Sequence, residues 1–260
     1  MVKEFESQTH SVASGNGMFP PRMTIERNGN HQYRSVSADG THTTWCPSVT
    51  AICGHLESGQ FTAGKNWFKG LVTQHNGDIE QAEQASEYGL MEGNRVHAAI
   101  DNYIKHGVVD EDDDVFMQWY IALGDRNWIA SEHFVIRDAK DSSWAYGGTV
   151  DAIERVGDTY VVWDWKTKDI NQYKKYGSRP KEHAQLSGYF EAIDHMGWVW
   201  DPIDERPLSP YRPNVARLAY IFRDASPIDI VDVDLDAAGR LFHNSRLTYY
   251  ALKEFRNGRR

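Results

Sequence analysis

Apolar and polar positions alternate most regularly in the stretch Gly147–Thr167, where two strand-like runs flank a short turn. The runs are Thr149–Val156 and Thr159–Lys166, and both are rich in β-branched and aromatic residues. The Gly157-Asp158 pair between them is typical of a tight hairpin turn. The pattern therefore predicts a β-hairpin, and we expect the rest of the chain to be organised around it.

Charged side chains fall on one face of this hairpin. Asp151 lies in the first run, and Asp164 and Lys166 lie in the second. Because strand side chains alternate between faces, Asp164 and Lys166 point one way while Trp163 and Trp165 point the other. Two carboxylates and an ammonium on one side indicate a divalent-metal site, which suits phosphodiester hydrolysis. The alternative is an ion pair on a surface strand, but the bulky neighbours favour burial, where charges are costly unless paired or metal-bound.

The remaining periodicity predicts an α/β fold. Helices are expected over Ala63–Gln74, Ile79–Tyr88, Asn94–Lys105, Val115–Ile129 and Pro180–Met196, from Pro47–Thr50 to about Leu56, and from an Asp234 cap to about Phe255. Strands are expected over Ser131–Arg137, Val215–Phe222 and Ile228–Val233, with a small hairpin formed by His31–Val36 and Thr41–Trp45. A loop is expected around Tyr173 and Tyr176, and a turn-rich segment over Asp201–Pro213.

The chain is expected to consist of an arm and one domain. Met1 to about Asn30 is polar, with scattered glycine and proline, which predicts a loose, flexible N-terminal arm. Residues 31–260 contain no internal repeat and no clear boundary, so we expect a single domain. A length of 260 residues is enough for one large domain with a sizeable core.

Composition narrows the class of protein. Cys46 and Cys53 cannot by themselves form a four-thiolate zinc or iron–sulfur site, and nothing indicates a disulfide framework. We therefore expect a reducing, cytoplasmic setting. No apolar run is long enough to span a membrane, and Glu4 and Glu6 argue against a signal or transit peptide.

The formal net charge of -9 counts against non-specific wrapping of DNA. It does not exclude a nuclease, because carboxylates of a metal site add to the negative count and binding depends on a local basic surface. Basic and aromatic residues gather just after the hairpin, and this mixture is typical of single-strand binding. The members of this group are Tyr173, Lys174, Lys175, Tyr176, Arg179 and Lys181.

Three helices carry further polar candidates, each with an ordinary structural alternative. His97 lies at the edge of an apolar stripe with Asp101 one turn later, which fits either a metal ligand with its orienting group or a satisfied histidine. Gln185 and Tyr189 share a helix face. They fit either residues that position the site or a helix that packs its tyrosine on the core beside a polar neighbour. Ser48 is a good helix cap whose neighbouring N–H groups can also hold a phosphate. Thr50 and Arg95 are further candidates for nucleic-acid contact.

The order of these motifs resembles that of the PD-(D/E)xK nuclease superfamily. The series is G-x-x-x-H from Gly93, S-E at Ser131, G-G-T-V-D from Gly147, D-W-K-T from Asp164 and Q-L-x-x-Y from Gln185. It is most similar to the RecB-like branch, and P-S-V-T at Pro47 with D-W-K-T resembles the mitochondrial single-strand exonuclease and its phage relatives. The resemblance covers Pro47–Tyr189.

The resemblance implies a restriction-endonuclease-like mixed central sheet flanked by helices. It implies metal binding by His97, Asp151, Asp164 and the backbone carbonyl of Trp165, with Glu132 as a second-metal or outer group. Lys166 would be the catalytic lysine, and Gln185 and Tyr189 would be positioning residues. The expected ion is Mg²⁺ or Mn²⁺. Iron–sulfur members of the branch have four cysteines, so with two this chain is expected to lack the cluster.

The function expected from these residues is metal-dependent exonuclease action on single-stranded DNA ends, in recombination, repair or replication, in a bacterial host cytoplasm if the protein is phage-encoded. The alternatives are a structure-specific or double-strand-acting endonuclease of the same fold, and a catalytically inactive DNA-binding or assembly protein. Intact Asp151, Asp164 and Lys166 argue against the inactive protein.

Overall fold

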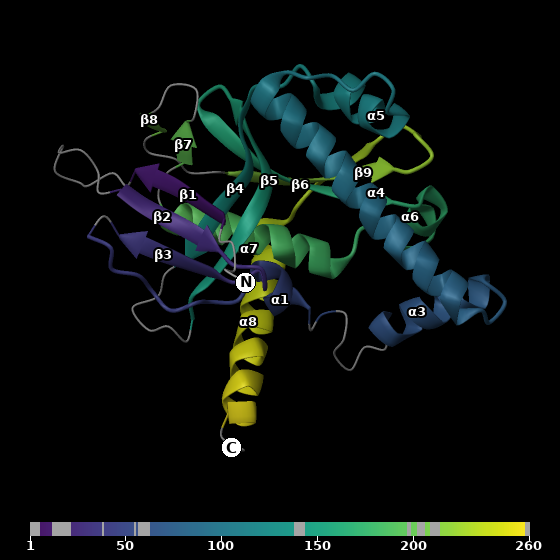
Figure 1. Cartoon of the computed structure of the whole chain (residues 1–260), viewed down its shortest axis with the longest axis horizontal. Coiled ribbons are helices and arrows are strands. Elements are labelled where there is room, and N and C mark those ends of the chain that lie inside the picture. Colours follow the sequence, from purple (N-terminus) through teal and green to yellow (C-terminus); the bar gives the residue numbers. More distant parts are fainter. Residues whose placement is uncertain are drawn as a thin grey trace.

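The structure is a computed structural model that describes residues 6–11, 22–37, 39–54, 56, 63–137, 144–196, 199–201, 206–208 and 214–257. The strands are β1 (Glu6–Ser11), β2 (Arg22–Arg27), β3 (Tyr33–Ser37), β4 (Trp128–Arg137), β5 (Tyr146–Val156), β6 (Thr159–Lys168), β7 (Val199–Asp201), β8 (Arg206–Leu208), β9 (Val215–Phe222) and β10 (Asp229–Asp232). The helices are α1 (Val49–Cys53), α3 (Ala63–Gln74), α4 (Ile79–His106), α5 (Asp114–Leu123), α6 (Ile170–Tyr176), α7 (Pro180–Met196) and α8 (Leu235–Asn257). The fold is α/β (Figure 1).

A five-stranded mixed sheet forms the centre of the molecule, with the strand order β10-β9-β6-β5-β4. Strands β4, β5 and β6 are antiparallel neighbours, and β5 and β6 form the predicted hairpin around Gly157-Asp158. β9 lies parallel to β6, from Val161↔Val215 to Lys168↔Phe222. The middle strand, β6, is buried over most of its length, which explains why its sequence is apolar on both faces.

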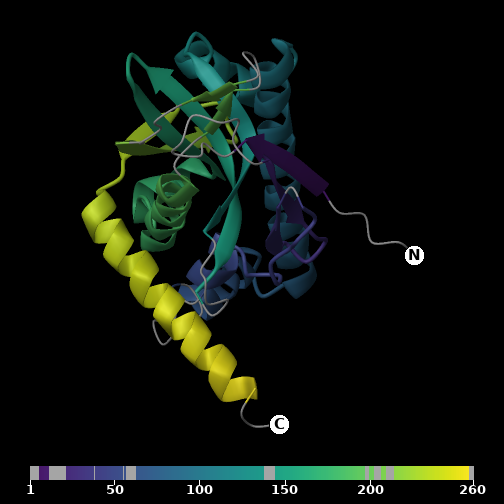
Figure 2. The same cartoon turned by 90° about the vertical axis from the view of Figure 1, so that its left-hand side faces the viewer.

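Helices cover both faces of this sheet (Figure 2). On one face, α4 and α5 pack on an aromatic core that includes Trp119, Trp163 and Trp165. On the other face, α1, α7 and α8 pack on a core that includes Val162 and Phe242. Val162 and Trp163 thus point to opposite faces of β6, as the alternation predicts. Asp164 and Lys166 extend the row of Val162 toward α7.

The N-terminal segment forms a second, three-stranded sheet of order β1-β2-β3. The prediction of a loose arm is therefore wrong for the two strands before residue 30, and the domain boundary at that point stays a prediction. A non-local contact accounts for the error. The Gln8 side chain donates to the carbonyl of Glu132 at 2.6 Å and accepts the N–H of Phe134 at 2.7 Å. It thereby holds β1 beside β4, at the edge of the central sheet.

Two adjacent glycines let other elements approach β5 closely. A Cβ added to Gly147 would lie 2.5 Å from Cβ of Tyr33, and one added to Gly148 would lie 2.4 Å from a ring carbon of Tyr189. Any side chain at either position would collide with a tyrosine. The G-G pair therefore brings β3 and α7 against the strand that carries Asp151.

Most predicted elements are confirmed. α3 and α7 match the expected ranges, the expected Ser48 cap begins α1, and β9, β10 and the Asp234-capped α8 are present. The small hairpin is partly confirmed, because β3 makes bridges to residues 42 and 46 rather than to a full strand. Most of the turn-rich segment Asp201–Pro213 lies outside the described residues.

Three predictions differ from the structure, two in where helices begin or end and one in the type of element. The expected helices Ile79–Tyr88 and Asn94–Lys105 are one 28-residue helix, α4. The helix expected over Val115–Ile129 ends at Leu123, where Gly124 caps it, and β4 begins at Trp128. The expected loop around Tyr173 is helix α6, capped by Asp169. Within the described residues, no helix has the length and apolar character needed to cross a membrane.

Candidate active site

The candidate site lies where β5 and β6 separate. The paired part of the hairpin runs from Val156↔Thr159 to Ala152↔Trp163. Beyond it, the carboxylate of Asp151 accepts the backbone N–H of Trp165 at 2.6 Å. The Asp151 side chain thus takes the place of a backbone hydrogen bond between β5 and β6, and this bond holds the carboxylate against β6.

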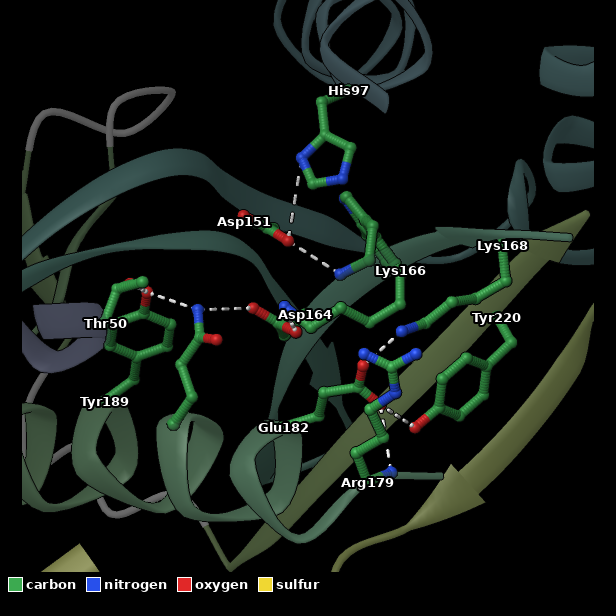
Figure 3. A network of polar contacts seen from close by, with 12 residues as sticks. Thr50, His97, Asp151, Asp164, Lys166, Lys168, Arg179, Glu182, Tyr189 and Tyr220 are labelled. Carbon is green, nitrogen blue, oxygen red and sulfur yellow. Dashed lines mark hydrogen bonds and ion pairs between the residues drawn. The ribbon is translucent and has the colours of Figure 1, made fainter. Parts of the chain in front are cut away.

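Three candidate metal ligands converge beside this fork. His97 from α4, Glu132 from β4 and Asp151 from β5 offer ligand atoms that all lie within 4.8 Å of one another. His97 Nδ1 is 3.8 Å from Asp151 Oδ2 (Figure 3). Glu132, expected only as a second-metal or outer group, is a full member of this cluster. Among the described residues, no other group of histidine, cysteine or acidic side chains has this arrangement.

Glu132 adopts an unusual backbone conformation. Its φ is +48°, in the left-handed region that residues other than glycine rarely occupy. Such a conformation costs on the order of 1–3 kcal/mol and persists when the surroundings impose it. Here the Gln8 side chain holds the Glu132 carbonyl, and Ser131 donates its hydroxyl to the carbonyl of Asp151 at 3.3 Å. The sequence gives no local sign of this conformation, and Gln8 lies in the segment predicted to be a loose arm.

Asp164 and Lys166 form the second half of the site. The two side chains form an ion pair, and Asp164 is only 1% exposed. The other oxygen of Asp164 accepts the Gln185 amide at 3.5 Å, and the same amide donates to the Tyr189 hydroxyl at 2.8 Å. Figure 3 shows the chain of contacts from Tyr189 to Lys166. The predicted positioning pair on α7 thus contacts Asp164, and reaches Lys166 only through it.

Burial and like charges raise the pKa values of the acidic cluster. Burial raises the pKa of Asp151 to about 8, and Asp164 adds to the effect while Lys166 opposes it. Burial raises the pKa of Glu132 to about 7, with a further contribution from Asp151. Ionisation of both carboxyl groups is therefore unfavourable without further positive charge nearby. A divalent cation would supply the positive charge that this cluster lacks, so these residues fit a metal site.

The two basic members of the site respond in opposite directions. Burial, together with the charge of Lys166, lowers the pKa of His97, which leaves its imidazole neutral and able to act as a ligand. Burial alone would lower the pKa of Lys166, but Asp164 and Asp151 outweigh it, and the net pKa is raised. Lys166 is therefore a stable cation at neutral pH. Asp101, predicted as an orienting group for His97, pairs instead with Lys105 at 2.8 Å.

A cavity of about 840 Å³ opens onto the metal-ligand cluster. His97, Glu132 and Asp151 line it, as do Ser48 and Thr50 of the α1 region. Ser48 is buried and accepts the N–H of Ala51 at 3.0 Å, so it is chiefly a helix cap. Thr50 is exposed, and its hydroxyl lies 3.5 Å from that of Tyr189.

The other predicted nucleic-acid residues lie in different surroundings. Arg95 pairs with Glu92 and with Asp113, the buried cap of α5, so its guanidinium is occupied in joining α4 to α5. It lines a separate acidic cavity that also includes Arg223. The assignment of Arg95 as a nucleic-acid contact therefore has no geometric support.

The basic and aromatic group after the hairpin is divided by the structure. Tyr173 donates its hydroxyl to Asp229 and packs against Tyr220, with ring centroids 4.4 Å apart and ring planes tilted by 36°. The expectation that Tyr173 stacks on a base stays a prediction. Tyr176 is 63% exposed on α6, and Lys175 lies over its ring at 5.1 Å. The remaining basic members are Lys174, which is exposed, and Arg179 and Lys181, which are half-buried.

A second buried charge cluster, missed at the sequence level, lies beside the candidate site. Glu182 of α7 forms an ion pair with Lys168, accepts the Tyr220 hydroxyl at 2.9 Å and accepts the backbone N–H of Arg179 at 3.1 Å. Figure 3 shows this cluster next to Asp164. Lys168 lies two positions after Lys166 on β6, so the alternation of strand side chains places both lysines on the same face. This spacing could have indicated a second charged group beside the site.

No protein-family model matches the chain, and no curated protein matches it. A solved structure titled "Crystal structure of SSO0001" is similar with a TM-score of 0.42 and 15% sequence identity, over 77% of this chain and 75% of that one.

Proposed function

We propose that this chain is a divalent-metal-dependent deoxyribonuclease, specifically an exonuclease that hydrolyses phosphodiester bonds at single-stranded DNA ends. The observation that carries the proposal is the convergence of His97, Glu132 and Asp151 within 4.8 Å, beside the ion pair of Asp164 and Lys166. Such a combination suits a phosphodiesterase, because the reacting phosphate is negative and gains charge in the transition state.

We further propose that the mixed sheet is of the restriction-endonuclease-like type and that the chain belongs with the RecB-like PD-(D/E)xK nucleases. The proposal is supported by where the motifs lie in the structure. They are scattered along the sequence on α4, β4, β5, β6 and α7, and they meet around the fork between β5 and β6. A set of unrelated coincidental motifs has no reason to converge in this way.

The metal would be Mg²⁺ or Mn²⁺, which accept oxygen ligands and, for Mn²⁺ in particular, an imidazole. When bound, it would polarise the scissile phosphate and lower the pKa of an attacking water. The proposed donors are one imidazole, the carboxylates and one backbone carbonyl, from His97, Glu132, Asp151, Asp164 and Trp165.

The protein's own residues supply fixed charge and orientation. Lys166 stays protonated because Asp164 and Asp151 raise its pKa, so it acts as a cation that stabilises the developing negative charge and not as a base. Gln185 and Tyr189 hold the Asp164 carboxylate from the side of α7. Asp164 in turn holds the ammonium of Lys166.

An end-labelled nuclease assay tests the proposal. Single- and double-stranded DNA and RNA, labelled at either end, are incubated with Mg²⁺, Mn²⁺ or a chelator. We expect metal-dependent shortening of single-stranded DNA from an end, and loss of that activity in Asp151→Asn but not in the exposed control Asp232→Asn. Cleavage that persists in chelator would contradict the metal-dependent mechanism.

A second substrate pair separates the alternatives. Covalently closed single-stranded circles have no ends, so an exonuclease should leave them intact while it degrades the linear form of the same sequence. Equal rates on both forms would identify an endonuclease. Metal-dependent binding of DNA with no cleavage of any substrate would identify an inactive DNA-binding protein.

A further inference from the structure

The turn between β2 and β3 forms another wall of the cavity that opens onto the metal-ligand cluster. Asn30 and His31 of this turn and Arg27 at the end of β2 all line the cavity. The turn is firmly built, because the Asn28 side chain accepts the N–H groups of Asn30 and Gln32, both at 3.0 Å. His31 has a φ of +52°, which the turn imposes and which presents its exposed side chain at the cavity. The proposed mechanism uses none of these residues.

Arg27 connects this turn directly to the strand that carries Asp151. Its guanidinium donates to Thr149 Oγ1 at 3.2 Å, and the Tyr33 hydroxyl lies 2.9 Å from the same oxygen. Thr149 precedes Asp151 by two positions on β5, and both residues line the cavity.

The charge of Arg27 is available to a ligand. Of the described residues that line this cavity, Arg27 alone carries a full positive charge. Its ion-pair partner is Glu6, whose side chain is 63% exposed, and such exposed pairs contribute little. A guanidinium has five N–H donors, so the bonds to Thr149 and Glu6 leave others for an anion.

We propose that Arg27, Asn30 and His31 form a subsite that binds the phosphate next to the scissile one in a single DNA strand. The proposal rests on the proposed function and extends it from the reacting phosphate to the neighbouring nucleotide. In this role the β2–β3 turn holds the strand in register with the metal-ligand cluster and contributes nothing to bond cleavage.

Arg217 provides a matched control. It pairs with an exposed acid, Asp232, and lies 5.5 Å over the ring of Trp163, much as Arg27 pairs with Glu6 and lies 5.1 Å over the ring of Phe134. Arg217 is on β9 and does not line the cavity. Replacing either arginine by glutamine therefore removes the same kind of local contact, and only Arg27→Gln removes a proposed phosphate contact.

The experiment measures binding of a fluorescent single-stranded oligonucleotide by anisotropy in Ca²⁺, over a series of salt concentrations, together with kcat and KM in Mn²⁺. We expect Arg27→Gln to weaken binding about tenfold. Loss of one phosphate contact should also reduce the slope of log K against log salt by about 0.7. KM should rise with kcat nearly unchanged, because the contact is remote from the reacting bond. Arg217→Gln should match wild type.

Two further variants keep the test independent of any folding defect. His31→Gly suits the positive φ and should also weaken binding. Glu6→Gln releases Arg27 from its ion pair and should strengthen binding severalfold. Binding and salt slopes for Arg27→Gln and Glu6→Gln that equal those of wild type would overturn the subsite while leaving the nuclease proposal intact. Absence of metal-dependent cleavage by wild type would overturn both.

Discussion

Two buried charge clusters lie side by side against the same strand, β6, and they satisfy their carboxylates very differently. Glu182 receives donors from Lys168, Tyr220 and the backbone of Arg179. Burial would raise its pKa, but Lys168, the backbone N–H of Arg179 and the charge of Lys166 together outweigh burial, and the net pKa is lowered. This acid is stable as an anion.

Two acids of the candidate active site, Asp151 and Glu132, lack such compensation. Asp151 accepts one backbone N–H, from Trp165, and the pKa of the His97 imidazole 3.8 Å away is lowered. Lys166 opposes the effect of burial on Asp151 but does not outweigh it. The pKa of Asp151 is raised to about 8, and that of Glu132 to about 7. Folded proteins rarely bury acids without partners unless something else is bound there. The difference separates a cluster that stabilises the fold from the cluster that we propose as the metal site.

The largest difference between the two clusters is expected in catalysis. Lys166→Ala should reduce cleavage of single-stranded DNA by about 10²–10³-fold or more, because a preorganised cation at the developing charge is lost. Lys168→Ala, two positions along the same strand face, should retain far more activity. Initial rates with a labelled oligonucleotide in Mn²⁺ measure both. Undiminished cleavage by Lys166→Ala would refute its assigned role.

For stability, we expect the larger effect in the cluster around Glu182 and the smaller effect in the candidate active site. Glu182→Ala should lower the free energy of unfolding by about 3–5 kcal/mol, because it leaves the buried ammonium of Lys168 without its partner. Asp151→Asn should leave the metal-free protein as stable as wild type or more stable, because burial disfavours the ionised form of the Asp151 carboxylate and asparagine does not ionise. Urea denaturation in chelator measures both changes. A large destabilisation by Asp151→Asn would place that acid with the structural cluster.

The pH dependence of stability should also differ between the clusters in metal-free protein. The folded pKa of Asp151 is raised, so its stabilising contribution is present below the unfolded pKa near 3.8 and is lost as pH rises toward 8. The folded pKa of Glu182 is lowered, so its contribution is present above the unfolded pKa near 4.5 and is lost as pH falls through the folded value.

Denaturation midpoints between pH 3 and pH 9 test these signs. Wild type should lose stability relative to Asp151→Asn as pH rises from about 4 to 8, by at most about 1.4 kcal/mol per pH unit. Glu182→Gln should flatten the acid side of the profile instead. Saturating Mn²⁺ should remove the alkaline loss in wild type. Parallel profiles for wild type and Asp151→Asn would show that Asp151 is not perturbed.

Local signals in the sequence account for what could be predicted. The β5–β6 hairpin carries its own alternation and turn, and α7 and α8 carry their own apolar periodicity, so these elements were found at nearly the right residues. His97, Glu132 and Asp151, which the structure brings together, each belong to one of the motifs. Their assignment as metal ligands rests on the order of the motifs and not on any one of them, and it stays a prediction.

Contacts between distant segments account for what was missed. The sequence predicts two helices, Ile79–Tyr88 and Asn94–Lys105, yet α4 continues through the residues between them. Gly89 and Gly93 in that stretch lie beside distant residues, and an added Cβ would be 3.2 Å from Arg223 and 4.0 Å from Thr167. Gln8 reaches across 124 positions to hold Glu132. No local pattern encodes such contacts.

Binding of Mn²⁺, followed by isothermal titration calorimetry, tests the central claim most directly. The account predicts that wild-type protein binds the ion, that Asp151→Asn and Asp164→Asn lose most of that affinity, and that the exposed control Asp232→Asn retains it. Glu182→Gln, if it folds, should also bind the ion normally, because that carboxylate is already satisfied. Wild-type affinity in Asp151→Asn would contradict the assignment of this cluster as the metal site.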